Sequence, residues 1–538
     1  MALDKNKQTA LINGNIYTVD SRFSKVVSVL IDGDRISLVG SNDDIKKYIT
    51  NQTEIIDLFG NTLIPGFIDS HAHYLSYGNL LKEINLNKTK SSIEALNIIE
   101  SVSLNYKKGD WITGRGWNHE QWSEKCFPSH LELSSITPDN PAYFRRVDGH
   151  AGWANLKAME LAHIDRFTTD PKGGKIIRDI DGNPTGIFID NAEQLITSII
   201  PKKSAGWKKD SAILVNNECI KLGITGVHDA ETDQDTIEIF RDLYKEDRIK
   251  LRLYVMLKGL DHFRNYISKS EMRIINNNKL TIKAVKLFMD GSLGSRSASL
   301  IEPYSDDPEN YGLLIMEEDE LYETTLEIIK NDFQVCVHSI GDNANHLVLN
   351  AYERAIKEIG GNNRRLRIEH AQILKSDDID RFSKNGIIPA VQPIQLISDM
   401  SWTEKRIGKN RLNGVYAFKS LIDSGAIVCS GTDFPVEEPD PLLGFYSAVT
   451  RSNFAGMPSD GWIPKEKISR EQALRSYTIN SAYASFEEDI KGSIEAGKLA
   501  DMVLLSRDIM SIEPTEILDT KVLMTMIGGE IVYQIPNY

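Results

Sequence analysis

Short apolar runs recur along the second half of the chain, and longer stretches with apolar residues at helical spacing separate them. One such stretch, 341–359, places Ala344, Leu347, Ala351 and Ala355 on one face of a helix. Together with residues 62–74 there are eight apolar runs, the strand count of a (β/α)8 TIM barrel. The other seven predicted strands cover 224–227, 251–256, 282–288, 334–337, 366–368, 387–391 and 427–429.

Both ends of the chain have a different pattern. Residues 9–60 and the last fifty residues are strand-rich, and pairs such as Asn13-Gly14 and Asp32-Gly33 lie between apolar runs as hairpin signals. Two all-β ends around an α/β middle predict that the termini come together in one β-sandwich domain.

Residues 91–222 interrupt the alternation of strands and helices. The pattern there predicts a helix over 92–106, strands near 111–117 and 141–147, and many turns. We therefore expect an inserted domain between barrel strands 1 and 2. The predicted boundaries are 1–61 and 488–538 for the sandwich, 62–90 for the first barrel strand, 91–222 for the insertion and 223–487 for the rest of the barrel.

Composition narrows the class of protein. The 538 residues are 41% hydrophobic and 26% charged, as in a globular protein of more than one domain. A net charge of −14 without any basic run argues against a nucleic acid or an anionic membrane as partner. The first residues lack the apolar core of a signal peptide and no run of about 18 apolar residues is found, so we expect a cytoplasmic protein. Its four cysteines form no Cys-x-x-Cys pair, which argues against a disulfide framework or a thiolate metal site.

Candidate chemistry begins with His71 and His73, at the carboxyl end of the run 62–74. Side chains two apart on a strand face the same way, so both imidazoles can reach one metal ion. Lys286, His338, His370 and Asp433 lie late in, or at the ends of, four later predicted strands. Because catalytic groups of a parallel barrel gather at the carboxyl ends of its strands, we expect these residues to meet. Imidazoles and a carboxylate without thiolates are typical of a catalytic metal site with an open position for water.

Six motifs in order carry a resemblance to a known family. They are Thr62-Leu-Ile-Pro-Gly-Phe-Ile-Asp-Ser-His-Ala-His-Tyr, Asp148-Gly-His-Ala, Lys286-Leu-Phe-Met-Asp-Gly-Ser-Leu-Gly-Ser-Arg, His338-Ser-Ile-Gly-Asp, Arg367-Ile-Glu-His-Ala-Gln and Ser430-Gly-Thr-Asp-Phe-Pro. Along almost its whole length the chain resembles the metal-dependent amidohydrolases, and within them the branch that includes N-substituted formamide deformylase (amidohydrolase family 3).

This resemblance implies a divalent metal site, with one or two ions and zinc as the expected metal, held by His71, His73, His338, His370 and Asp433. It also implies that the insertion helps to roof the active site. The position of Lys286 matches a lysine that carbon dioxide often carboxylates in this superfamily, making an anionic bridge between two metals. The alternative, an unmodified Lys286 paired with Asp290 or with a phosphate-like group, stays open.

The function that follows is hydrolysis of a non-peptide carbon–nitrogen bond, in an amide or an N-substituted formamide. In the predicted mechanism a metal-activated hydroxide attacks the carbonyl carbon, the metal and His338 stabilise the oxyanion, and Asp433 transfers the proton to the leaving nitrogen. A helix N-cap is the alternative role of Asp433. The rival functions are a deaminase or cyclic-amide hydrolase on the same scaffold, and a non-catalytic regulatory barrel protein.

Further residues are predicted to contact the substrate. The candidates are Trp117, Asp148, His150, Asp290, Arg296 and Gln395; relatives commonly carry a histidine at the position of Gln395. His228, on the second barrel strand, is predicted to support the metal ligands from behind. As partner we expect a small-molecule amide, with no nucleic acid and no membrane, and we leave open a homo-oligomer such as a dimer.

Overall fold

A computed structural model of the protein describes residues 8–269, 273–275, 278–360 and 363–536. The expectation that the chain begins without a signal peptide rests mainly on residues 1–7, which lie outside the described residues. Within them, no helix has both the length and the apolar character needed to cross a bilayer.

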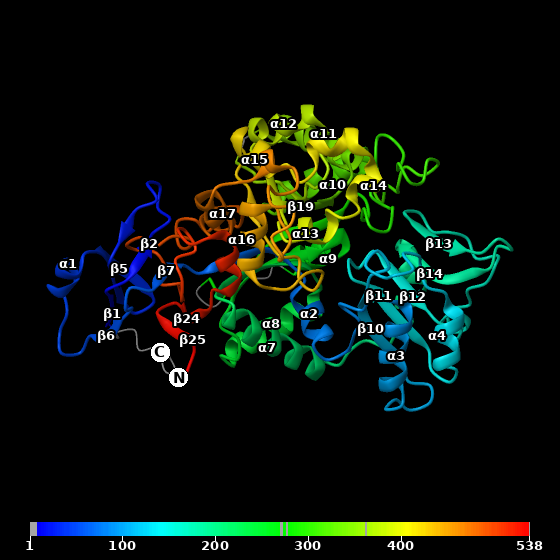
Figure 1. The fold of residues 1–538 in the computed structure, drawn as a ribbon, viewed down its shortest axis with the longest axis horizontal. Helices are drawn as coiled ribbons and strands as arrows, with labels where there is room; N and C mark the ends of the chain where they lie inside the picture. The colour runs from blue at the N-terminus through cyan, green and yellow to red at the C-terminus, as the bar shows by residue number, and fades with distance from the viewer. Residues whose placement is uncertain (1–7, 270–272, 276–277, 361–362, 537–538) are drawn as a thin grey trace.

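Eight parallel strands form a nearly closed barrel at the centre of the molecule (Figure 1). In sheet order they are β8 (Phe67–Ala72), β15 (Ile224–Thr232), β16 (Arg252–Lys258), β18 (Leu280–Phe288), β19 (Gln334–Ser339), β20 (Arg367–His370), β21 (Ile388–Val391) and β22 (Cys429–Ser430). The ends approach each other where the Asp433 N–H donates to the His71 carbonyl oxygen at 2.7 Å and the His73 N–H donates to that of Phe434 at 2.8 Å. The predicted TIM barrel is confirmed.

Amphipathic helices follow most barrel strands. Ile237, Phe240 and Leu243 of α8 are buried in the same apolar cluster as Val227 and Val255 of the strands. The helix predicted over 341–359 is α11, and a capping box formed by Ser469 and Gln472 opens α17. The main helices are α7 (Ala205–Lys221), α8 (Gln234–Lys245), α9 (Gly259–Ser268), α10 (Glu318–Lys330), α11 (Asp342–Ile359), α12 (Ile379–Asn385), α15 (Phe418–Asp423), α16 (Pro441–Thr450), α17 (Arg470–Ser476) and α18 (Ile479–Ala484).

The run 62–74, predicted as one strand, is two. β7 (Thr62–Pro65) pairs with β23 (Met502–Leu505) in the sandwich, and only β8 belongs to the barrel. Gly66 joins them at a point of close packing, where a Cβ atom would lie 2.2 Å from Cγ2 of Thr225. The structure therefore places the first change of domain at Gly66, four residues after the predicted boundary.

The two termini share a β-sandwich, as predicted. Leu11, Val29, Met502 and Met524 meet in the core between its two sheets. One sheet has the order β5 (Arg35–Gly40), β4 (Ser28–Asp32), β1 (Gln8–Ile12), β6 (Glu54–Asp57). The other has the order β25 (Glu530–Gln534), β24 (Val522–Ile527), β23, β7, β2 (Asn15–Tyr17), β3 (Lys25–Val26).

The insertion forms a six-stranded sheet on the side of the barrel away from the sandwich (Figure 1). Trp117, Trp122 and Trp153 fill its core. The sheet order is β13 (Gly174–Arg178), β14 (Pro184–Asp190), β12 (Ala151–Ala154), β11 (Ala142–Arg146), β10 (Ile112–Trp117), β9 (Ile84–Asn85), and its helices include α3 (Ser92–Ser103) and α4 (His130–Ile136).

Candidate active site

His71, His73 and Asp433 meet at the mouth of the barrel. One ligand atom from each lies within 4.8 Å of the other two. Oδ1 of Asp433 is 3.7 Å from Nε2 of His71 and 3.3 Å from Nε2 of His73. His71 lies near the end of β8 and His73 directly follows that strand, and Asp433 follows β22 in a left-handed backbone conformation with φ of 62°. The predicted meeting of the first and last strands is therefore present.

The second ring nitrogen of each histidine fixes which atom faces the site. Nδ1 of His73 lies 3.0 Å from the carbonyl oxygen of Ala230, which can only accept a hydrogen bond. Nδ1 of His71 contacts the Glu369 carboxylate. Burial would raise the pKa of Glu369, but Arg367 and His71 lower it to about 2, so this group is an ionised acceptor. Each Nε2 is left with a lone pair that can bind a cation.

These atoms fit a divalent metal ion. Nε2 of His71 and Oδ1 of Asp433 are buried and have no hydrogen-bond partner among the described residues. An imidazole lone pair and a carboxylate oxygen that face each other repel unless a proton or a cation lies between them. The donor set of imidazoles and a carboxylate suits zinc and its neighbours.

His338 and His370 extend the group across the barrel. The ring centroids of His71 and His370 are 5.0 Å apart, and those of His370 and His338 are 4.5 Å apart. Burial lowers the pKa of His370 to about 3 and that of His338 well below its usual value, so both rings are neutral. Nε2 of His338 lies 3.2 Å from the Gly291 carbonyl oxygen and must donate to it, which leaves Nδ1 with the lone pair. This arrangement favours a ligand role for His338 over the predicted role as an oxyanion donor.

Lys286 lies on β18 beside these ligands and is 1% exposed. Its Nζ has no hydrogen-bond partner among the described residues and lies 4.1 Å from the centre of the Phe288 ring. Burial lowers its pKa. The alternative pairing with Asp290 is not formed, because the Asp290 carboxylate accepts the backbone N–H groups of Ser299, Ile340 and Gly341.

Gln395 reaches Asp433 directly. Its Nε2 donates to Oδ2 of Asp433 at 2.8 Å, which leaves Oδ1 for the site. Burial would raise the pKa of Asp433, but its contact with His73 and the nearby rings of His71 and His370 lower that pKa below its usual value. Gln395, predicted to contact the substrate, thus orients the carboxylate from the rim of the cavity.

Arg367, which was not among the predicted site residues, is fully buried beneath the candidate metal ligands. Arg367 donates to both oxygens of Glu369, at 2.8 and 3.0 Å, and to Nδ1 of His228 at 2.9 Å. His228 therefore supports the site indirectly, through Arg367 and Glu369 to His71. In a regular strand, residues 369 and 370 face opposite sides. If His370 faces the site, the sequence pattern therefore predicts that Glu369 faces away from it. The positive φ of His370, 75°, breaks the alternation and brings both to the site.

A cavity of about 870 Å³ opens above the ligands, between the barrel and the insertion. His73, His338, His370 and Asp433 line its floor; Asp148, His150 and Gln395, three of the predicted substrate residues, also line it. The other three lie elsewhere. Trp117 is fully buried in the core of the insertion, Asp290 accepts main-chain hydrogen bonds, and Arg296 pairs with Asp306 at 2.9 Å.

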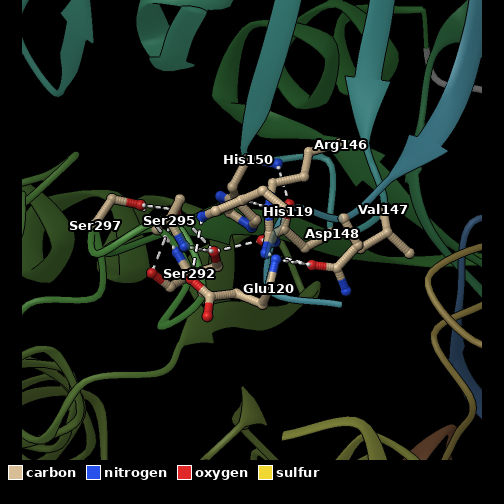
Figure 2. A network of polar contacts seen from close by, with 12 residues as sticks. His119, Glu120, Arg146, Val147, Asp148, His150, Ser292, Ser295 and Ser297 are labelled. Carbon is tan, nitrogen blue, oxygen red and sulfur yellow. Dashed lines mark hydrogen bonds and ion pairs between the residues drawn. The ribbon is translucent and has the colours of Figure 1, made fainter. Parts of the chain in front are cut away.

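Figure 2 shows a network of polar contacts that ties the insertion to the loop after β18. Nη1 of Arg146 contacts Oδ2 of Asp148 at 2.5 Å, and the same oxygen accepts from the Ser292 hydroxyl at 2.5 Å. Burial would raise the pKa of Asp148, but Arg146 and His150 lower it to about 2. Nδ1 of His150 lies 2.6 Å from Asp190; burial alone would lower the pKa of His150, but this carboxylate raises it to about 8.

A second part of the network reaches a barrel helix. Arg406, on α14 (Thr403–Ile407), is fully buried and contacts both Glu120 of the insertion and Asp306 of the loop after β18. Glu120 also lies 3.1 Å from His119. The insertion, which forms the roof of the cavity, is therefore attached to the barrel by buried charged contacts.

Comparison with known proteins agrees with this geometry. Residues 54–533 match the amidohydrolase family. The chain is 34% identical to Protein LONG AFTER FAR-RED 3 of Arabidopsis thaliana, over 97% of this chain and 91% of that protein, and 29% identical to N-substituted formamide deformylase of Arthrobacter pascens, over 97% and 98%. The crystal structure of an uncharacterized metal-dependent hydrolase from Pyrococcus horikoshii superposes with a TM-score of 0.77 at 29% identity, over 94% of this chain and 99% of that one. The chain belongs to the amidohydrolase family and is an enzyme, a metal-dependent hydrolase that acts on carbon–nitrogen bonds.

Proposed function

We propose that the protein hydrolyses a small non-peptide amide, with N-substituted formamides as the leading class. The observation that carries this proposal is the meeting of the buried His71 with His73 and Asp433, which line the floor of the cavity. The likeness to a formamide deformylase favours the formamide over other amides. We also propose a cytoplasmic location, which the four free cysteines support.

The residues present would hold one or two divalent ions, zinc being the metal that suits them best. When bound, such an ion polarises a carbonyl oxygen and acidifies water. Four imidazoles would offer it a lone pair, those of His71, His73, His338 and His370. Burial lowers the pKa of His71, His338 and His370 and keeps these rings neutral. Contacts with Glu369 and with the Ala230 carbonyl oxygen fix the tautomers of His71 and His73.

Asp433 is the group that would move the proton. Gln395 holds Oδ2, so Oδ1 faces the floor of the cavity, where it can take a proton from water and deliver it to the leaving nitrogen.

Lys286 is proposed to carry a carboxylate. A protonated ammonium buried without any partner is costly. A neutral amine there adds carbon dioxide, forming a nitrogen–carbon bond and releasing one proton, and the product is an anion among the ligands. The described surroundings of Nζ support this, because no side chain occupies the place of a partner.

The test combines metal analysis with a substrate panel. We expect reconstituted protein to hold transition metal, and Lys286→Ala to reduce its content from two ions to one per chain. The panel contains N-substituted formamides, other amides, cyclic amides and aromatic amines for deamination. Release of formate and amine from a formamide supports the proposal. Absence of metal, or activity only on the cyclic amides or aromatic amines, contradicts it.

A further inference from the structure

Two arginines lie side by side in the roof of the cavity. Arg115 on β10 and Arg145 on β11 are direct partners in the parallel register of these strands, and both line the cavity. Like charges opposite each other on neighbouring strands destabilise a sheet. Something must therefore compensate this pair.

Arg145 is compensated within the protein. Its Nε lies 3.2 Å from Oε2 of Glu193, which is buried and also accepts from the Tyr143 hydroxyl. The cavity's other lysines and arginines, Arg115 aside, have carboxylate partners as well: Lys88 with Glu438 at 2.8 Å, Arg146 with Asp148 at 2.5 Å and Lys258 with Glu231 at 2.9 Å.

Arg115 is the exception. It is 8% exposed, yet no carboxylate among the described residues lies within ion-pair distance, 4.0 Å. Its hydrogen bonds go only to the Val147 carbonyl oxygen, from Nη2 at 2.7 Å and from Nε at 3.3 Å, and Nη1 has no partner among the described residues. Burial and the Arg145 charge lower the pKa of Arg115 to about 10, so it stays protonated at neutral pH.

The backbone around Arg115 is shaped to hold it in place. A register shift follows Arg115, and Gly116 at that shift has φ of 111°, where a Cβ atom would lie 2.2 Å from Oδ1 of Asn87. Trp117 then anchors the strand, because its indole N–H donates to the Phe144 carbonyl oxygen at 2.7 Å. A buried cation held this firmly is organised in advance for an anion.

We propose that Arg115, assisted by Arg145, binds a carboxylate of the substrate, so that the substrate is an anionic amide such as an N-formyl or N-acyl amino acid. This inference rests on the proposed hydrolase function. Arg115 and Asp433 line the same cavity, so one small molecule can place its carboxylate at the roof and its amide at the floor. A guanidinium donates two N–H groups to a carboxylate in a geometry that an amide or an ester does not match.

Hydrolysis of matched substrates tests the proposal. The pairs are N-formylphenylalanine against its carboxamide, in both enantiomers, and 4-(formamidomethyl)benzoate against N-benzylformamide. Loss of one partner of a buried charge pair is expected to cost about 30-fold or more. We therefore expect kcat/KM to be higher for the anionic member by at least that factor, and Arg115→Met to abolish this preference.

The matched control is Arg178→Met. Arg178 also lies in the insertion and donates to main-chain carbonyl oxygens, including that of Gly182 at 3.2 Å, but it does not line the cavity. This variant should keep the preference. Equal rates within each pair for the wild type, or a preference that survives Arg115→Met, would overturn the proposal.

A binding measurement separates this proposal from the hydrolase function. Hydrocinnamate and hydrocinnamamide are titrated into the purified wild-type, Arg115→Met and Arg178→Met proteins by calorimetry. We expect hydrocinnamate to bind the wild type and Arg178→Met. We expect its affinity for Arg115→Met to be lower than for the wild type by about 30-fold or more. A carboxylate that binds Arg115→Met as tightly as the wild type, or that binds none of the proteins, overturns the anion site. If Arg115-dependent binding is found but no substrate is hydrolysed, the proposed function fails and the anion site stands.

Discussion

The floor and the roof of the cavity each contain a buried arginine, and the two are balanced differently. Arg367, under the floor, is fully buried and donates to both oxygens of Glu369. Burial alone would lower the pKa of Arg367, but Glu369 raises it above its usual value, whereas burial and Arg145 lower the pKa of Arg115 to about 10. A charge balanced inside the protein can only orient its neighbours. A charge left unbalanced at a cavity can bind something from outside.

The two regions also differ in how they are held. The floor is built on barrel strands, whose ends are fixed by the sheet itself. The roof depends on side-chain contacts, chiefly those of Arg406 and of Asp148. Substitutions in the floor should therefore change catalysis or metal binding. Substitutions in the contacts of the roof should instead loosen the folded structure of the insertion.

The largest effect is expected at Asp433 in the floor. Asp433→Asn keeps the shape and one oxygen but removes the base, and general acid–base groups contribute about 10² to 10⁴ in rate. We expect kcat for the amide found in the panel to fall by that factor while the variant still folds and holds at least one metal ion, which metal analysis beside the kinetics checks. Asp423→Asn, at a surface pair with Lys419, is the control. Near wild-type turnover in a metal-loaded Asp433→Asn protein would exclude the proton transfer and leave Asp433 as a dispensable ligand, since the N-cap of the following helix α16 is Asp440 and not Asp433.

Arg406→Met tests the attachment of the roof. It leaves Glu120 and Asp306 buried without this partner, and breaking a buried ion pair costs about 3–5 kcal/mol. We expect faster hydrogen exchange in β10 and β11, with exchange in β8 and β15 little changed. Arg354→Met, which removes exposed pairs on α11, should leave both regions unchanged. Equal loosening of floor and roof would mean that the two regions unfold as one unit.

Glu369→Gln tests whether the charge under the floor orients His71. Partners behind a metal-bound histidine typically contribute 10 to 100-fold to metal affinity. We expect chelator competition to show weaker binding by that factor, whereas Glu353→Gln, at a remote pair with Arg381, should bind metal as the wild type does. Unchanged affinity in Glu369→Gln would assign Glu369 to neutralising Arg367 alone.

Much of the floor could be predicted because its residues follow from local pattern. His71, His73, His338 and His370 each end an apolar run, and the carboxyl ends of parallel strands meet in a barrel, so alternation and strand count were enough to bring them together. The split of the run 62–74 at Gly66 was not predictable in this way, because both halves have the pattern of a buried strand and only their partners, β23 and β15, assign them to different domains.

The sequence alone determined the barrel and the sandwich of both termini and singled out His71, His73 and Asp433, which meet at the mouth of the barrel, because hydrophobic periodicity and chemical type are local properties of a chain. Tertiary structure decided which charges are balanced. The sequence predicts Arg296 as a substrate residue, but the fold pairs Arg296 with Asp306, whereas Arg115 beside the cavity has no carboxylate partner among the described residues. Glu369 joins the site only through the backbone turn at His370. Charge balance depends on distances between segments far apart in the chain, and only the folded packing sets those distances.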